Sequence, residues 1–480
     1  MNLLILCPDQ LRADYLSCYG HPFINTQNID RLAAEGVRFE KAYCAAPLCG
    51  PSRISFVTSI RFSEHNHRNY GSTIDYAVPN LVRALKEAGY RTAMFGKNHC
   101  FNYEQLKYIW DELHEICLGN YDEHPRYQRS FDAFPLEPDH PYNITALLAD
   151  EAISFIRRQP KGKPWFCWVN WQDPHPAFTC PEPYFSMFDR GAIEIPPGYR
   201  DTYKKNKPKR LKNWQVNSLA LQATDDEIKN AIAAYMGQVK YVDDSVGRII
   251  SALEETGQIE NTLVVFLADH GEFLGDQGAF HKIGVFYEYL TRIPVIIRHP
   301  EGKYRGVFSG LVEEVDLAPT ILDALGIPIP PTFVGKSLHA RLVEGKLGKE
   351  YGRPTALVEA GLQAPTWPNP VGHNQKAPFP PNNFGPGAMI TDGRYKLSVY
   401  YDDVCELYDL ETDPKELENR FDDPELRDVQ NQLTLELCKR LMGIGIRDIG
   451  SIAWPEPGMD PRDAPIEVVA LQKCIRFRTN

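Results

Sequence analysis

Hydrophobic and polar positions alternate along most of the chain in the manner of an α/β protein. Residues 2–6 form a short apolar run, and residues 261–269 form a longer one that ends at Asp269. Runs that are apolar at nearly every position are typical of strands buried on both faces of a parallel sheet. We interpret the run at 293–300 as a further strand of the same kind.

The segments between these runs have the spacing of amphipathic helices. Helices are predicted at 28–36, 78–90, 143–159, 224–257 and 315–326, and further strands at 37–44, 91–95 and 164–172. Such alternation predicts an α/β fold with a large, mostly parallel central sheet flanked by helices.

The pattern changes towards the C-terminus. Residues 362–387 are rich in Pro, Asn and Gly and are expected to form a lid loop. Residues 388–414 predict two or three antiparallel strands with tight turns, and 424–445 predict a terminal helix. We therefore divide the chain into a larger α/β domain at 1–345 and a smaller C-terminal α+β subdomain with an antiparallel sheet at 346–480.

Polar side chains follow four of the predicted strands directly. They are Asp9 and Gln10 after 2–6, Lys97 and His99 after 91–95, His175 after 164–172, and Asp269 and His270 after 261–269. The carboxyl ends of parallel strands meet at one edge of a sheet, and ligands bind there in such folds. We therefore expect these side chains to form a single site.

The composition is that of an ordinary globular protein, with 43% hydrophobic and 24% charged residues. A length of 480 residues predicts two domains, or one large domain with a smaller one attached. The formal net charge of −11 argues against nucleic acid as a partner. An anionic substrate would have to be held by a local group of cations.

The ends of the chain and its cysteines bear on location. The N-terminal MNLLILCPDQ has no basic residue before its apolar run, so we interpret it as a buried strand, not a signal peptide. The sequence has no apolar run near the ~20 residues that span a bilayer, so no membrane contact is expected. The 11 scattered cysteines do not fit a disulfide framework. We expect a cytoplasmic protein. A leader that had been removed would make it a periplasmic or secreted protein. The sequence is also compatible with a homo-oligomer.

The stretch LCGPSRISF at 48–56 combines a cysteine, a proline and an arginine at the start of a predicted helix. Pro51 suits the first helical turn, so Cys49 would lie at the N-terminus, where backbone N–H groups favour an anion. Arg53, one turn further on, offers a planar fork of donors for an oxyanion. By itself the pattern fits equally well a small buried cysteine ahead of a helix.

The strand-end residues include a candidate metal site. Asp9, Gln10, Asp269 and His270 offer two carboxylates, an amide oxygen and an imidazole. Mainly oxygen donors suit Ca²⁺ or Mg²⁺, and Mn²⁺ tolerates the histidine well. Taken singly, the first pair also fits a polar turn after a strand, and the second pair fits a helix cap.

Several segments together resemble the type I, formylglycine-dependent sulfatases of the alkaline phosphatase superfamily. CGPSR at 49–53 matches the Cys-x-Pro-Ser-Arg signature of that family. The other matching segments occur in the family's order: FGKNH (95–99), QDPHPAF (172–178), ADHGEFLGDQG with HK and YE (268–288), DGRYKL (392–397) and LYDLETDPKELEN (407–419). The resemblance covers most of the chain and implies an alkaline-phosphatase-like fold, with the sulfatase domain at 1–345.

The resemblance implies an enzyme that hydrolyses small carbohydrate or aryl sulfate esters and releases inorganic sulfate. In the family the signature cysteine, here Cys49, is oxidised to formylglycine by a formylglycine-generating or sulfatase-maturating enzyme. The hydrated aldehyde is then the nucleophile. The resemblance also implies one divalent metal, with Ca²⁺ expected before Mn²⁺ or Mg²⁺, bound by Asp9, Gln10, residue 49, Asp269 and His270.

A cationic and acid–base set around the sulfate group is implied in the same way. Its members are Arg53, Lys97, His99, His175 and Lys282. Preorganised cations stabilise the charge that builds during sulfate transfer. His175 or Lys282 is expected to protonate the departing alcohol or phenol, and His99 to help deprotonate the second hydroxyl of residue 49.

Departures from the family pattern leave alternatives open. Many sulfatases carry two acidic residues where this chain has Asp9-Gln10, and an Asp-Gln pair occurs in the related phosphonate monoester hydrolases. Lys97 and His99 favour the sulfatase, because the phosphonate branch usually has neutral residues there. A phosphonate monoester or phosphodiester hydrolase is therefore the alternative, ahead of a catalytically silent binding protein with unmodified Cys49. The run FVTSIRFSEHNH at 56–67 lacks a glycine usual in the family, which leaves the substrate open.

Overall fold

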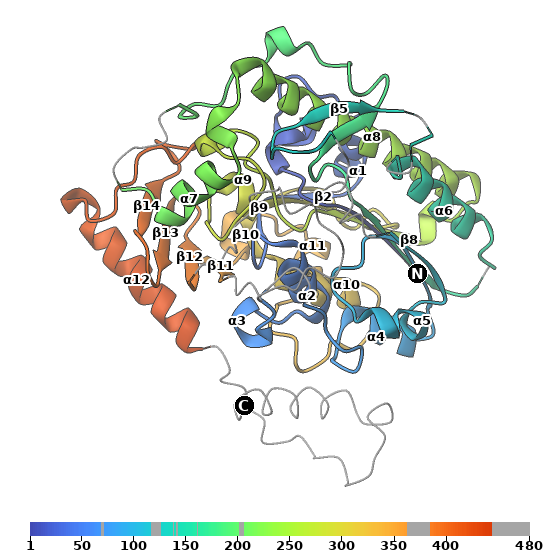
Figure 1. The fold of residues 1–480 in the computed structure, drawn as a ribbon. Helices are drawn as coiled ribbons and strands as arrows, with labels where there is room; N and C mark the ends of the chain where they lie inside the picture. Colours follow the sequence, from blue (N-terminus) through green and yellow to red (C-terminus); the bar gives the residue numbers. More distant parts are fainter. Residues whose placement is uncertain are drawn as a thin grey trace.

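Two sheets organise the computed structural model, which describes residues 1–68, 72–116, 126–137, 139–140, 143–160, 162–200, 206–361 and 385–443. A central eight-stranded sheet carries helices on both faces, and a four-stranded sheet lies beside it (Figure 1). The chain is thus an α/β protein with a smaller α+β part near its C-terminus, as predicted. The division at residue 345 stays a prediction.

The strands of the large sheet lie in the order β10-β2-β9-β8-β1-β6-β3-β4. Their bounds are β1 Asn2–Pro8, β2 Val37–Tyr43, β3 Arg91–Gly96, β4 Glu112–Glu115, β6 Trp165–Trp171, β8 Thr262–Leu267, β9 Arg292–Arg298 and β10 Gly306–Glu313. Strands β8, β1, β6 and β3 are consecutive and parallel. The carboxyl ends that we expected to share one edge are therefore neighbours.

Strand β9 corrects one expectation. The apolar run at 293–300 predicts a parallel strand, and this prediction is wrong, because β9 is antiparallel to both β2 and β8. The apolar run indicates that the strand is buried on both faces, as β9 is, but it does not indicate the direction of the strand in the sheet. Between β8 and β9 there are only the 3-10 turn Asp276–Gly278 and the four-residue α9 (Glu288–Thr291). The chain therefore turns back at the same edge, and no crossover helix carries it to the opposite edge.

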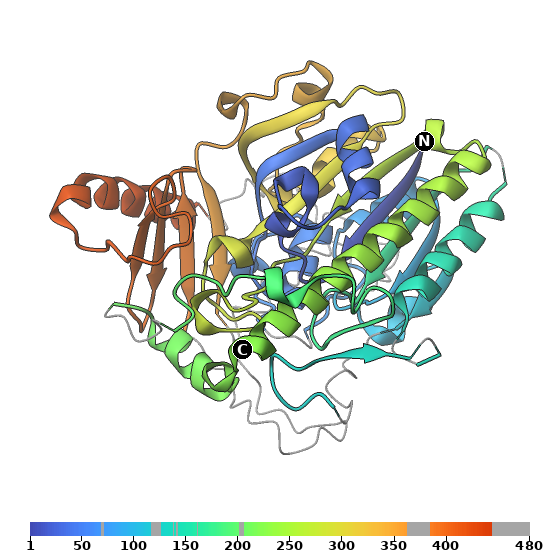
Figure 2. The same cartoon turned by 90° about the horizontal axis from the view of Figure 1, so that it is seen from above.

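Side chains of the central strands alternate between two cores. In β1, Leu3 and Ile5 belong to one core, while Leu4 and Leu6 belong to the other. The first core is covered by α2 Cys49–Thr58, α4 Leu81–Glu87, α5 Leu106–Ile109 and α10 Leu317–Ala324, and the second by α1 Gln27–Glu35, α6 Thr145–Arg157 and α8 Asp225–Glu255 (Figures 1 and 2). The five helices predicted from sequence are confirmed as α1, α4, α6, α8 and α10.

The remaining elements are short. They are α3 Phe62–His65, α7 Lys209–Asn217, α11 His339–Val343 and a parallel pair of strands, β5 Ala133–Leu136 and β7 Phe178–Pro181.

The long α8 begins at a capping box in which Thr224 and Glu227 satisfy each other's backbone N–H groups. That start explains why the sequence pattern predicted this helix so well.

The smaller sheet is antiparallel throughout, in the order β11-β12-β13-β14. Its strands are β11 Ala356–Ala360, β12 Gly387–Thr391, β13 Tyr395–Tyr400 and β14 Glu406–Asp409. Helix α12 (Arg427–Met442) packs Leu433 and Leu437 against it. The three later strands and the helix were predicted, and β11 was missed. The predicted lid loop at 362–387 lies almost wholly outside the described residues.

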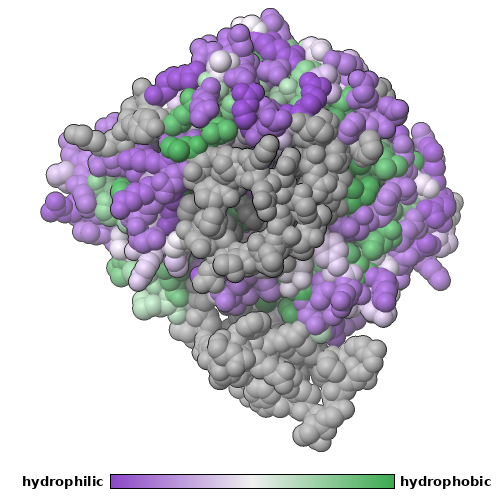
Figure 3. All heavy atoms as spheres, in the orientation of Figure 1, coloured by the Kyte–Doolittle hydropathy of each residue, from purple (hydrophilic) through white to green (hydrophobic). Residues whose placement is uncertain are grey.

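Hydrophilic side chains predominate over the described part of the face drawn in Figure 3, with smaller hydrophobic patches between them. Among the helices that the structure describes, none has the length and apolar character needed to cross a bilayer.

Candidate active site

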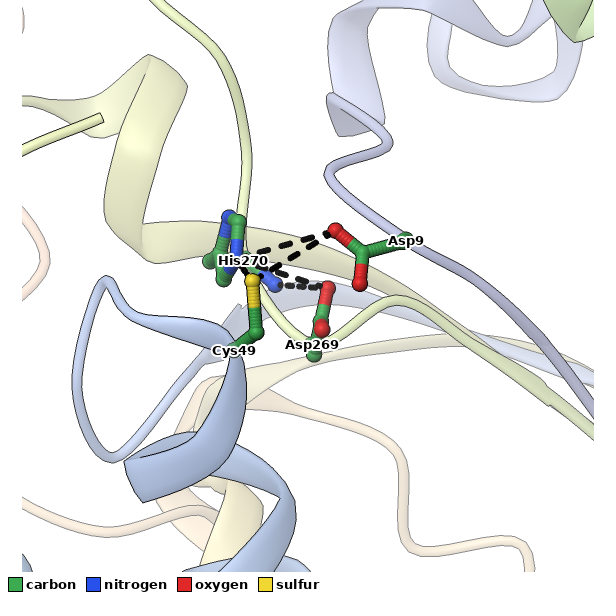
Figure 4. A group of neighbouring side chains, drawn as sticks. All are labelled: Asp9, Cys49, Asp269 and His270. Atoms are coloured by element: carbon green, nitrogen blue, oxygen red, sulfur yellow. Dashed lines mark hydrogen bonds and ion pairs between the residues drawn. The ribbon is translucent and has the colours of Figure 1, made fainter. Parts of the chain in front are cut away.

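Cys49 is the first residue of α2, at the carboxyl edge of the large sheet. The preceding Leu48 is extended, and Pro51 lies in the first turn of a helix that is buried along its whole length. The thiol sulfur is 3.1 Å from Nε2 of His270 and 3.7 Å from Oδ1 of Asp9. Figure 4 shows the thiol pointing into the group formed by these side chains and Asp269.

The donor atoms of Asp9, Cys49, Asp269 and His270 all lie within 4.8 Å of one another. Asp9 follows β1, while Asp269 and His270 follow β8, so three elements supply the group. All four residues are buried. Two carboxylates and an imidazole in a water-excluded place fit a divalent cation, which would compensate the buried negative charge.

Gln10 joins this group through its backbone. It has a positive φ of 64°, and its N–H donates to Oδ1 of Asp269 at 3.0 Å. Its side-chain amide donates to Glu272 and accepts from Lys282. The role of Gln10 as a metal ligand therefore stays a prediction. To bind a metal ion, its side-chain oxygen would first have to lose the hydrogen bond from Lys282.

Arg53 binds both carboxylates at once. Its Nε donates to Oδ2 of Asp269 at 2.8 Å, and its Nη2 donates to Oδ2 of Asp9 at 3.2 Å. Nζ of Lys97 lies 2.6 Å from the same oxygen of Asp9. Burial alone would raise the pKa of Asp9, but the positive charges around it, led by Lys97, hold that pKa well below its usual range.

The same cations act on the thiol. Burial and the charge of Asp9 raise the pKa of Cys49, but Lys282, Lys97 and His270 outweigh them and lower it. The site therefore favours negative charge at residue 49.

A glycine positions Lys97 and His99. Gly96 has a φ of 102°, and a Cβ there would collide with the carbonyl oxygen of Asn170 in the neighbouring strand. The close approach lets the chain leave β3 with Lys97 buried against Asp9 and His99 partly exposed. Burial and the charge of Lys97 lower the pKa of His99 well below its usual range.

His175 lies on the loop after β6, where its backbone N–H donates to the backbone carbonyl oxygen of Gln172 at 2.9 Å. Asp173 anchors this loop, because its carboxylate accepts from Oγ1 of Thr145 at 2.6 Å and Nε2 of Gln238 at 3.0 Å. Burial, together with Lys282 and Lys97, lowers the pKa of His175. The imidazole is therefore neutral near pH 7.

Comparisons with known proteins agree with this geometry. A family model described as Sulfatase matches residues 1–327. The chain belongs to the sulfatase family. A second model, described as N-sulphoglucosamine sulphohydrolase, C-terminal, matches residues 382–442. The chain is thus a hydrolase of this family, with a fold of the alkaline-phosphatase type.

Three similar proteins illustrate the range of this family. An arylsulfatase of Clostridium perfringens is 26% identical over 92% of this chain and 94% of its own. An N-acetylglucosamine-6-O-sulfatase of Bacteroides thetaiotaomicron is 26% identical over 90% of this chain and 84% of its own. The solved phosphonate monoester hydrolase of Silicibacter pomeroyi has a TM-score of 0.77 at 26% identity, covering 95% of this chain and 98% of its own.

Asn170 is a residue of the sulfatase site that sequence reasoning missed. Its Oδ1 accepts from Nη1 of Arg53 at 2.8 Å, so it completes the set of partners around the guanidinium. The signal was its position: a lone amide in the otherwise apolar run 165–171 has to find a partner when it is buried.

The structure places His281 next to His175, with ring centroids 6.1 Å apart. Its Nε2 lies 2.6 Å from the hydroxyl oxygen of Tyr127. Burial lowers its pKa to about 3, so the ring is neutral beside Lys282.

Replacing Asn170 by alanine tests its hold on Arg53. The change leaves a buried guanidinium N–H without its acceptor, at a cost of about 1–3 kcal/mol. We expect kcat/KM for a sulfate ester to fall about 10- to 100-fold, measured by steady-state kinetics. The matched control is Asn2→Ala, which removes a buried amide at the opposite end of the neighbouring strand. Equal activity of the two variants would contradict this role.

Asp173 predicts a pH dependence of stability. Burial raises its pKa from 3.8 to about 6 in the folded protein. Between these values the folded chain holds a proton that the unfolded chain has lost, so the free energy of unfolding decreases as the pH rises from about 4 to about 6. The full difference corresponds to about 3 kcal/mol.

We expect Asp173→Asn to remove this part of the pH dependence, as measured by urea unfolding across the same range. Asp428→Asn, at an exposed position, is the control. Parallel stability curves for wild type and Asp173→Asn would show that the assignment is wrong.

Proposed function

We propose that this sulfatase hydrolyses carbohydrate or aryl sulfate esters and releases inorganic sulfate, with Cys49 acting after conversion to formylglycine. The observation that carries the proposal is the place of Cys49. The residue heads a buried helix and points into a group of two carboxylates and an imidazole, with Arg53 and Lys97 behind the carboxylates. The names of the similar arylsulfatase and N-acetylglucosamine-6-O-sulfatase support this substrate class.

Conversion of Cys49 requires a maturation enzyme, of the formylglycine-generating or sulfatase-maturating class. Cys49 is 1% exposed in the folded chain. An enzyme could not reach its sulfur there, so conversion has to precede folding of α2 onto the sheet.

Asp9, Asp269 and His270 would hold a divalent ion, with Gln10 and the converted residue 49 as the remaining protein ligands. Ca²⁺ is the proposed ion, because oxygen donors predominate in this set. When bound, such an ion lowers the pKa of a neighbouring hydroxyl and so favours a nucleophile at neutral pH.

The cations of the chain itself bind and orient the substrate. Arg53 cannot turn away, because two carboxylates and Asn170 hold its guanidinium. Lys97 and Lys282 are buried as well. Fixed positive charges in a water-excluded site attract an anion strongly and need little rearrangement as its charge develops.

The histidines divide the proton transfers. His99 is neutral near pH 7, which suits a proton acceptor at the hydroxyl of residue 49. His175 is also neutral in the free site. A bound anion beside its ring raises the pKa of His175 again, so that it can donate to the departing alcohol, a role for which Lys282 is the alternative.

A phosphonate monoester or phosphodiester hydrolase is the second candidate. The Asp9-Gln10 pair and the likeness to the phosphonate monoester hydrolase of Silicibacter pomeroyi favour it. The ion pair of Lys97 with Asp9 favours the sulfatase, because it keeps an additional positive charge beside the anion.

Mass spectrometry and two substrates test the proposal together. In protein from its native host, we expect peptide AYCAAPLCGPSR (42–53) to carry the thiol-to-aldehyde mass loss at Cys49 and not at Cys44. The protein should turn over p-nitrophenyl sulfate faster than p-nitrophenyl phenylphosphonate, and Cys49→Ala should remove both activities. Faster phosphonate turnover would favour the second candidate. Two unmodified cysteines would defeat the formylglycine mechanism and favour a silent binding protein.

Chelation tests the metal site. Dialysis against EDTA should lower both the melting temperature and activity, and added Ca²⁺ should restore them. An ion at 100 times its dissociation constant stabilises the folded state by about 2.7 kcal/mol. Asp269→Asn should abolish the response to Ca²⁺, and the exposed Asp428→Asn should keep it. A melting temperature and activity that ignore both EDTA and Ca²⁺ would contradict the site.

A further inference from the structure

Two consecutive carboxylates, Glu313 at the end of β10 and Glu314 directly after it, lie in opposite surroundings. Both are buried. Glu313 pairs with Arg61 at 2.9 Å and also with Arg353 and Arg440. Burial would raise the pKa of Glu313, but these three arginines lower it to about 2. Within the described part of the chain, no ion pair reaches Glu314.

Glu314 instead contacts the segment that carries Cys49. Its Oε2 accepts from the backbone N–H of Ala45 at 2.8 Å. Both carboxyl oxygens lie 2.8 Å from Oγ of Ser52, the serine of the CGPSR stretch. Ser52 Oγ is also 2.6 Å from the backbone carbonyl oxygen of Asp269.

The number of hydrogen atoms available in this chain of contacts decides the protonation state of Glu314. A serine hydroxyl has one hydrogen, and a backbone carbonyl can only accept. Ser52 therefore gives its hydrogen to Asp269, and the contact between Ser52 and Glu314 needs a hydrogen on the carboxyl group. A neutral Glu314 satisfies every partner, since it donates to Ser52 and accepts from Ala45.

We propose that Glu314 is a positioning residue which, as the neutral acid, holds Ser52 and with it the first turn of α2 against the backbone of Asp269. Cys49 lies on that turn, and Asp269 belongs to the group into which its thiol points. Glu314 thus sets the position of the nucleophile relative to this group without touching either. The catalytic part of this inference rests on the proposed function; the hydrogen-bonded contact itself does not.

The electrostatic surroundings support a neutral Glu314. Burial, with a smaller contribution from the charge of Asp269, raises its pKa to about 8 against the hydrogen bond from Ala45, the contact with Ser52 and the charge of His270. The thiols of Cys7 and Cys44 also face it, and burial raises their own pKa values, so both are neutral. Above about pH 8 the carboxyl group loses the hydrogen that Ser52 needs.

The test uses four variants. Glu314→Gln keeps the shape and the pattern, because its amide donates to Ser52 and its carbonyl accepts from Ala45 at any pH. Glu314→Leu and Ser52→Ala each break the contact, and Ser52→Ala removes only one hydroxyl if the leucine variant fails to fold. Ser55→Ala is the matched control, because its hydroxyl lies on the same helix but pairs with Nε2 of His65 at 2.9 Å.

Turnover of p-nitrophenyl sulfate should be divided by the fraction of protein converted at Cys49, measured by mass spectrometry. We expect kcat to fall about 10- to 100-fold in Glu314→Leu and Ser52→Ala, and by less than about threefold in Glu314→Gln and Ser55→Ala. The alkaline limb of the pH profile should move to higher pH in Glu314→Gln. An equal loss in Glu314→Gln and Glu314→Leu, or superimposable alkaline limbs of wild type and Glu314→Gln, would overturn the proposal.

Amide hydrogen exchange of peptides from residues 42–53 gives a readout that needs no turnover. Exchange should accelerate in Glu314→Leu and Ser52→Ala and remain as in wild type in Glu314→Gln and Ser55→Ala. If wild type hydrolyses no sulfate ester, the proposed function fails while this measurement still decides the contact. Unchanged exchange in Ser52→Ala would overturn it.

Discussion

The site depends on one buried interaction, in which the guanidinium of Arg53 forms ion pairs with the carboxylates of Asp9 and Asp269. All three side chains are at most 1% exposed. A buried charge without a partner is strongly destabilising, so the guanidinium and the two carboxylates stabilise one another there. The interaction therefore ties α2, β1 and β8 together, and these elements bring Cys49 and His270 with them.

The parallel sheet makes this meeting possible. Strands β8, β1, β6 and β3 are consecutive, and Cys7, Asn170 and Gly96 lie level with one another across three of them. The residues after each strand therefore leave the sheet at the same height. A side chain one to four positions past a strand end reaches the site, which explains why the polar ends formed a recognisable pattern in the sequence.

The sequence predicts the features that depend on local pattern, and it does not reveal those that depend on distant contacts. The strand-end carboxylates and the helix at Cys49 are local features and were predicted. Asn170 meets Arg53 from 117 positions away, and Glu314 meets Ser52 from 262 positions away. An apolar run states how deeply a strand is buried, so it could not give the direction of β9. Strand β11 likewise depends on pairing with β12, which begins only at Gly387.

The charge balance around Cys49 connects these residues to the choice of substrate. Arg53, Lys97 and Lys282 supply three positive charges beside the two carboxylates of Asp9 and Asp269. An acidic residue in place of Gln10, or an ionised Glu314, would each add one negative charge to this region. Within a chain of net charge −11, a local positive excess is what admits an anionic ester. The neutral amide at position 10 and the neutral acid proposed at position 314 therefore add no negative charge to this part of the chain.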